Sequence, residues 1–219
     1  MRPSLSNLSE FIVTLSIWAV PTVFAIVLHE VMHGYVANLL GDDTAARAGR
    51  LTLNPLNHVD PIGTIIMPAL LLFLHLPVFG YAKPVPVDFR RLSPPRAGMI
   101  AVAAAGPLTN LALAVASAFV ARMLAPYINA PWGEAVALPI VYMMQASVMI
   151  NVLLAVFNLL PLLPLDGGRV LAGLLPLRAA RTFARLEPYG LLILFALLYT
   201  NAVNVVISPL INAITRVLL

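Results

Sequence analysis

Residues 11–33 read FIVTLSIWAVPTVFAIVLHEVMH, an apolar stretch that ends in three ionisable side chains. From Phe11 to Leu28 it is long enough to cross a bilayer as a helix, because a span takes roughly 20 residues. The helical pattern continues to about Leu40 and stops at Gly41, a residue type common just after a helix end. The stretch therefore predicts a first transmembrane helix whose second half carries polar groups.

The composition of the whole chain agrees with this prediction. Of its 219 residues 61% are hydrophobic and 10% are charged, and the mean hydropathy is +0.94. A soluble domain is about 45–50% apolar and about 25% charged, and one of this size could not bury so much apolar surface. We expect an all-α integral membrane protein with a single membrane-embedded domain over residues 1–219 and no separate soluble domain.

Composition also excludes several kinds of site. The chain contains no cysteine, so disulfides, iron–sulfur clusters and cysteine-ligated zinc are ruled out. The net charge of +4 is scattered over loops, and this argues against a nucleic-acid partner. The partner that this composition implies is the lipid bilayer.

About five transmembrane helices fit the length. Besides the first, the apolar stretches are Ile62–Phe79, Gly98–Ala125, Ala135–Leu160 and Tyr189–Pro209. The first of these four contains Pro68, His75 and Pro77, and it is predicted either as a short span or as a re-entrant segment. Two polar stretches, RLTLNPLNH (50–58) and YAKPVPVDFRRLSPP (81–95), are predicted as short strand-like edges, because proline is excluded from central strands.

The basic residues predict an orientation. Ten of the 13 Lys and Arg residues fall on one side of the predicted spans, and we assign this side to the cytoplasm. The stretch 169–185, which is rich in arginine, is expected at this interface. Both flanks of Ile62–Phe79 then lie on the cytoplasmic side. Either that segment re-enters the membrane or the chain after Gly80 dips back into it.

The segment His29-Glu30-Val31-Met32-His33 is an HExxH motif on a predicted helix. At about 100° per residue, His33 lies one turn beyond His29 and about 40° around the helix, so both imidazoles can reach one metal ion. Glu30 can face a water molecule at that metal without being a ligand. Zn²⁺ suits these ligands and lowers the pKa of a water molecule to about 7.

The membrane setting strengthens this interpretation. A charge at bilayer depth costs at least about 2.5–3.5 kcal/mol, so ionisable groups clustered there need a compensating partner. The alternative is a helix end at the interface with solvated histidines. A catalytic zinc site takes three protein ligands. Asp166 is the best candidate for the third, because it follows a proline-broken span and precedes two glycines; the other candidates are Asp42, His58, Asp60 and His75.

Several motifs in order resemble the site-2 protease family of intramembrane zinc metalloproteases. They are HEVMH (29–33), AAGPLTN (104–110) and FNLLPLLPLDGG (157–168). GRLTLNPLNHVDPIGT (49–64) and GYAKPVPVDFRRL (80–92) resemble the compact bacterial and archaeal branch, and no PDZ-like insertion interrupts them. The resemblance implies that His29, His33 and Asp166 bind one zinc ion, that Glu30 is the general base, and that Asn110 and Asn158 contact substrate.

The resemblance also implies an activity, namely cleavage of peptide bonds within or next to transmembrane segments of membrane proteins, at a prokaryotic cell membrane. Its active site would face the cytoplasmic side. The extended stretch near Lys83 could hold a substrate by strand addition, or it could be a plain surface loop. Two other functions stay open: a zinc-stabilised, non-catalytic scaffold for membrane helices, and a secondary transporter. The transporter leaves the spacing of His29 and His33 unexplained.

Overall fold

The computed structural model describes residues 5–76 and 80–219, and within them it is helical with no strand. The prediction of an all-α membrane protein is therefore confirmed. The α-helices are α1 (Leu5–Leu39), α2 (Thr44–Arg47), α3 (Met67–Phe73), α4 (Pro95–Leu124), α5 (Leu138–Asn158), α6 (Asp166–Leu174), α7 (Leu177–Ala184), α8 (Gly190–Tyr199) and α9 (Ala202–Leu218). Short 3₁₀ and π turns join them.

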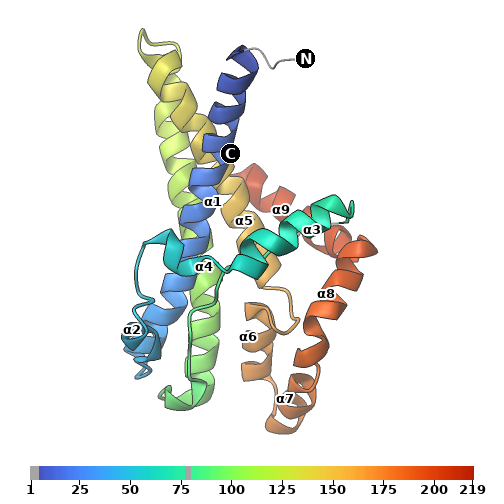
Figure 1. Ribbon diagram of the computed structural model, residues 1–219. Helices are drawn as coiled ribbons and strands as arrows, with labels where there is room; N and C mark the ends of the chain where they lie inside the picture. The colour runs from blue at the N-terminus through green and yellow to red at the C-terminus, as the bar shows by residue number, and fades with distance from the viewer. Residues whose placement is uncertain (1–4, 77–79) are drawn as a thin grey trace.

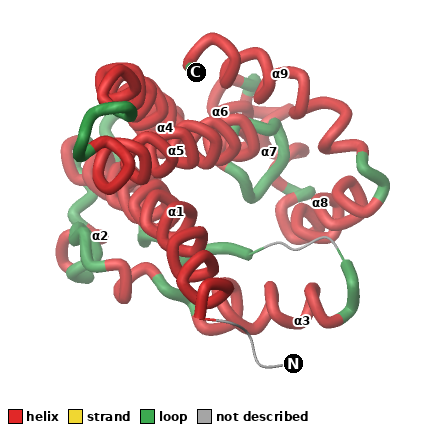
Figure 2. The backbone as a smooth tube through the Cα atoms, turned by 90° about the horizontal axis from the view of Figure 1, so that it is seen from above, coloured by secondary structure: helices red, strands yellow, loops and turns green. Residues whose placement is uncertain are grey.

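Three long helices, α1, α4 and α5, run side by side and form the centre of the molecule (Figures 1 and 2). Helix α4 packs against both of the others and against α6. In the described chain, four stretches are long and apolar enough to cross a membrane: Ile12–Leu39, Pro95–Tyr127, Gly133–Asn158 and Leu177–Tyr199. The buried face of α4 is rich in small residues, which lets helices approach closely in lipid.

The apolar stretch after Pro61 does not form a full span in the described residues. A π turn over Pro61–Ile66 continues into α3, and the resulting helix is shorter than the roughly 20 residues of a span. It lies across the bundle rather than along it (Figures 1 and 2). The end of Ile62–Phe79 lies outside the described residues, so the choice between a short span and a re-entrant segment stays a prediction. Asp60 begins the turn by accepting the N–H groups of Ile62 and Gly63.

The last predicted span, Tyr189–Pro209, is wrong as a single helix. It is divided into α8 and α9, which meet at Thr200 and Asn201. Asn201 has a left-handed backbone with φ of 60°, a conformation that asparagine tolerates better than most residues and that ends a helix. Helix α9 then packs back against α5.

The two predicted strand-like edges are not paired strands. In the first, Asn54 accepts the N–H of Leu56 and starts a 3₁₀ turn over Pro55–His58. In the second, residues 80–88 form an extended segment without regular secondary structure. Its prolines at positions 84 and 86 remove two backbone donors, which prevents a regular strand ladder. This part of the chain will be called the extended segment.

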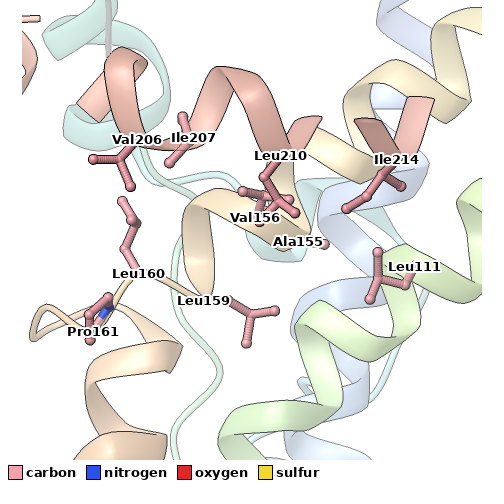
Figure 3. A pocket seen from close by; sticks show the side chains of 10 residues that line it. All are labelled: Leu111, Ala155, Val156, Leu159, Leu160, Pro161, Val206, Ile207, Leu210 and Ile214. Carbon is pink, nitrogen blue, oxygen red and sulfur yellow. The ribbon is translucent and has the colours of Figure 1, made fainter. Parts of the chain in front are cut away.

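A hollow of about 190 Å³ lies between α4, α5 and α9 (Figure 3). Leu111, Val156 and Ile214 are among the side chains that point into it, and every residue of its lining is apolar. It contains no group that could bind a metal or transfer a proton. The chemistry of the protein lies elsewhere.

Candidate metal centre

Helix α1 brings the two histidines of the HExxH motif together, one turn apart. Their Nε2 atoms are 3.0 Å apart, and both residues are buried. The helix runs unbroken through Pro21 to Leu39, so the motif lies well inside it. The predicted geometry, with both imidazoles facing one point, is what the structure has.

Asp166 completes this cluster from α6. Its Oδ2 lies 3.2 Å from Nε2 of His29 and 3.3 Å from Nε2 of His33. The two glycines that follow it allow the approach: a Cβ at Gly167 would lie 2.2 Å from the carbonyl oxygen of Leu159, and one at Gly168 would lie 2.5 Å from the backbone of Leu162. Only a chain without side chains there can fold the start of α6 this tightly against the end of α5.

The other candidate ligands lie elsewhere and have structural partners. Asp42 is buried and accepts the N–H groups of Thr44 and Asp88. Asp60 caps the turn before α3, Nε2 of His58 contacts the carbonyl of Thr52, and His75 is exposed. The ligand atoms of His29, His33 and Asp166 all lie within 4.8 Å of one another, which makes them the group suited to a metal among the residues described.

The hydrogen bonds of the two imidazoles fix which nitrogen faces the cluster. Nδ1 of His33 lies 2.7 Å from the carbonyl oxygen of Val102, which can only accept, so this nitrogen carries the proton. Nδ1 of His29 lies 2.6 Å from Oδ1 of Asn110 and likewise donates. In the neutral imidazole the other nitrogen is then a bare acceptor. Both Nε2 lone pairs therefore point toward Asp166.

Three acceptors that converge without a hydrogen between them need a cation or a proton at their centre. Oδ2 of Asp166 is buried without a hydrogen-bond partner, and such an atom needs an explanation. A carboxylate and two neutral imidazoles fit Zn²⁺, which takes three protein ligands in catalytic sites.

Gly106 of α4 forms the wall of the cluster. A Cβ there would lie 2.5 Å from Nε2 of His33 and 2.6 Å from Nε2 of His29. The space beside both ligand atoms therefore exists only because position 106 has no side chain. The sequence analysis did not single this residue out, although it lies within the AAGPLTN motif that carries part of the resemblance.

The cluster opens into a cleft of about 870 Å³ that contains Glu30. Its walls come from α1, the extended segment, α5, α6, α8 and α9, including Ala82, Asn158 and Leu194. Glu30 is half-buried there, and its Oε2 accepts the backbone N–H of Val85 at 3.1 Å. The prediction that Glu30 faces the site without ligating fits this position, because the carboxylate is held by the extended segment.

The two asparagines of the resemblance occupy different environments. Asn158, the last residue of α5, lines the cleft. Asn110 is fully buried and is not part of the cleft lining. Its amide nitrogen donates to the carbonyl of Ala25 and to Oδ1 of Asn151, so both of its protons are used within the protein. This arrangement corrects the expectation that Asn110 lines the substrate cleft.

Fold and site together have the features of a membrane-embedded metalloprotease: four potential spans, a His–His–Asp group that could hold a metal ion, and a glutamate beside it in a cleft. Comparison with known proteins agrees. Residues 122–200 match Peptidase family M50. The "Putative zinc metalloprotease YwhC" of Bacillus subtilis (strain 168) is 37% identical over 186 residues, which are 85% of this chain and 81% of that protein.

A second relative is the "Putative zinc metalloprotease Rip2" of Mycolicibacterium smegmatis (strain ATCC 700084 / mc(2)155), 30% identical over 209 residues, with 93% of this chain and 73% of that protein covered. No solved structure matches the chain at a significant level. The chain belongs to peptidase family M50, the site-2 protease family of zinc metalloproteases, as the motifs predicted.

Proposed function

We propose that this protein hydrolyses peptide bonds within or next to the transmembrane segments of other membrane proteins. It uses one zinc ion per chain, held by His29, His33 and Asp166. The observation that carries the proposal is the position of this ligand group, which lies inside a bundle of apolar helices and opens into the same cleft as Glu30. A site built at this depth suits a substrate that arrives within the membrane.

Glu30 is the general base in this proposal. Zinc, when bound, supplies a Lewis acid for the scissile carbonyl and acidifies a water molecule. The carboxylate of Glu30 takes the proton of the attacking water and later delivers it to the leaving amine. Its Oε2 is held by the N–H of Val85, which leaves Oε1 for the proton.

The extended segment is the proposed substrate platform. Tyr81 and Lys83 donate their N–H groups to the carbonyls of Gly63 and His58, at 3.1 and 2.9 Å. On the opposite side of the segment, Ala82 and Pro84 line the cleft, and the N–H of Val85 faces Glu30. In this proposal the backbone of the segment pairs with an unwound substrate in the manner of strand addition.

Asn158 is the proposed polar contact for the substrate backbone, because it lines the cleft. Its amide nitrogen donates to the carbonyl of Leu154, and its amide oxygen accepts no hydrogen bond from the residues that the structure describes. Asn110 is not proposed for this role. We place the active site on the cytoplasmic side of a prokaryotic cell membrane. In support, α2 and α7, which contain Arg47, Arg178 and Arg181, lie at the same end of the bundle (Figure 1).

The alternative is a zinc-stabilised scaffold without catalysis. The open cleft and the half-buried Glu30 favour the enzyme, because a scaffold has no need of a carboxylate beside a metal. A transporter is disfavoured by the convergence of three ligand atoms on one point.

The test is made in two steps on the full-length protein in detergent and then in lipid vesicles. Metal analysis is expected to find about one zinc per chain in the wild type and a loss of zinc in His29→Ala. Zinc-loaded wild type is then mixed with single-span membrane proteins whose spans contain helix-breaking residues, and fragments are mapped by mass spectrometry. Zinc binding without cleavage of any such substrate would support the scaffold instead.

A further inference from the structure

A chain of buried amides connects His29 to the interior of the helix bundle. Oδ1 of Asn110 accepts from Nδ1 of His29 at 2.6 Å, and Nδ2 of Asn110 donates to Oδ1 of Asn151 at 2.8 Å. Nδ2 of Asn151 donates to the carbonyl of Ser147 at 2.9 Å. The chain thus crosses from α1 through α4 to α5. Asn110 and Asn151 are 0% and 1% exposed, so both amides are shielded from bulk solvent.

The donor and acceptor of each hydrogen bond in this series of amides can be assigned by starting from Ser147. The Ser147 carbonyl can only accept, so the amide nitrogen of Asn151 must face it, and the amide oxygen is turned toward Asn110. Asn110 must then present its nitrogen to Asn151. The carbonyl of Ala25, 3.2 Å from the same nitrogen, requires the same orientation.

These hydrogen bonds also determine the tautomer of His29. Because the amide nitrogen of Asn110 already donates to Asn151 and Ala25, only its oxygen can face His29, and this selects the imidazole form that carries its proton on Nδ1. Nε2 is then the bare acceptor beside Asp166. His33 also carries its proton on Nδ1, because this nitrogen donates to the backbone carbonyl of Val102, which cannot rotate. The two histidines are therefore fixed differently, one by the backbone of α4 and one by side chains that a substitution can change.

We propose that Asn151 is a positioning residue for the metal site: acting through Asn110, it holds His29 in the orientation and protonation form that leave Nε2 open to the metal. The proposal rests on the zinc site of the proposed function. It assigns a role in metal binding to a residue of α5 that touches neither the metal ligands nor the cleft. Groups that orient ligating histidines typically change metal affinity about 10–100-fold when they are removed.

The experiment measures the zinc dissociation constant of the purified full-length protein by competition with a chromophoric chelator. Asn151→Leu keeps the number and branching of the side-chain heavy atoms but removes the hydrogen bonds to Asn110 and to Ser147, and we expect zinc affinity to fall about 10–100-fold. Asn151→Asp is the conservative variant. Burial favours the neutral acid, whose O–H can donate to Ser147 while the other oxygen still accepts from Asn110, so its affinity should stay near that of the wild type.

The matched control is Thr109→Val. Thr109 is adjacent to Asn110 on α4, and its hydroxyl donates within its own helix, to the carbonyl of Ala105. This variant should leave zinc affinity unchanged. Thermal unfolding of all zinc-free proteins is recorded in parallel. If Asn151 had a purely structural role, Asn151→Leu would lower the melting temperature, and Asn151→Asp would not restore the zinc affinity.

Equal zinc affinity in the wild type and Asn151→Leu would overturn the positioning role alone. An equal loss in Asn151→Leu and Asn151→Asp, with matched losses of thermal stability, would overturn it too. A wild type that binds no zinc would instead refute the proposed function on which the inference depends, so the two failures are distinct.

Discussion

The backbone N–H of Val85 donates to Oε2 of Glu30 across 3.1 Å, and this bond joins the extended segment to α1, the helix that carries the HExxH motif. The side chain of Val85 reinforces the contact, because it is buried and packs beside Gly34, where a Cβ would lie 2.7 Å from it. The proposed base and the proposed substrate platform are therefore positioned by one interaction. A substitution in the extended segment that removes this bond should therefore lower the rate of the proposed cleavage.

The first prediction concerns this bond. Val85→Pro removes the N–H while proline keeps the extended backbone, so Glu30 loses a donor. A hydrogen bond to a charged group contributes about 1.5–3 kcal/mol, so cleavage should fall roughly 10–100-fold with zinc retained. The measurement is the cleavage rate of a vesicle-bound substrate at saturating zinc.

Val85→Ala is the control for this experiment, because it shortens the side chain but keeps the N–H. Its cleavage rate should exceed that of Val85→Pro. If both variants are equally impaired, the packing of the side chain matters and the hydrogen bond does not.

The second prediction concerns the role of Glu30. Glu30→Gln keeps the shape and removes the base, so cleavage should fall by about 10²–10⁴-fold, the usual contribution of general acid–base catalysis. Zinc content should match that of the wild type, because Glu30 lies outside the ligand group. Metal analysis and fragment detection on the same preparation check both statements. A loss of zinc from this variant would make Glu30 a ligand.

The third prediction tests the origin of the third ligand. Asp166→Ala removes the carboxylate that faces both imidazoles, and zinc affinity should fall by more than the roughly 10–100-fold seen for groups that merely orient a ligand. Asp60→Ala is the matched control, since Asp60 caps the turn before α3 and lies outside the ligand group. The same titration on both variants distinguishes them. Normal affinity in Asp166→Ala would return the search to His58, and a loss of affinity in Asp60→Ala would make Asp60 the candidate.

The fourth prediction uses the space beside Gly106. Gly106→Ala should leave α4 intact, because alanine favours a helix by roughly 1 kcal/mol over glycine. Its methyl group would nevertheless enter the space next to both Nε2 atoms, which have to be free for a metal. We expect a folded protein with strongly reduced zinc content, measured by circular dichroism and metal analysis. Ala101→Val, on the exposed face of the same helix, is expected to bind zinc normally.

Some of these features followed from the sequence alone. The membrane class could be predicted, because 61% hydrophobic residues cannot be buried in a soluble domain of this length. The grouping of His29, Glu30 and His33 could be predicted too, because residues one helical turn apart share a face wherever the helix lies. The motif containing Asp166 predicted a ligand through its resemblance, although the residues themselves left five candidates.

Only the tertiary structure decided the rest, because those features depend on which helices pack together. The selection of Asp166 over Asp60 required α6 to fold against the end of α5. The path from His29 through Asn110 to Asn151 joins positions on three helices, and no local pattern indicates it. The break at Asn201 likewise depends on a backbone conformation that hydropathy does not contain. Periodicity determines which side of a helix is polar, whereas long-range packing determines what that side meets.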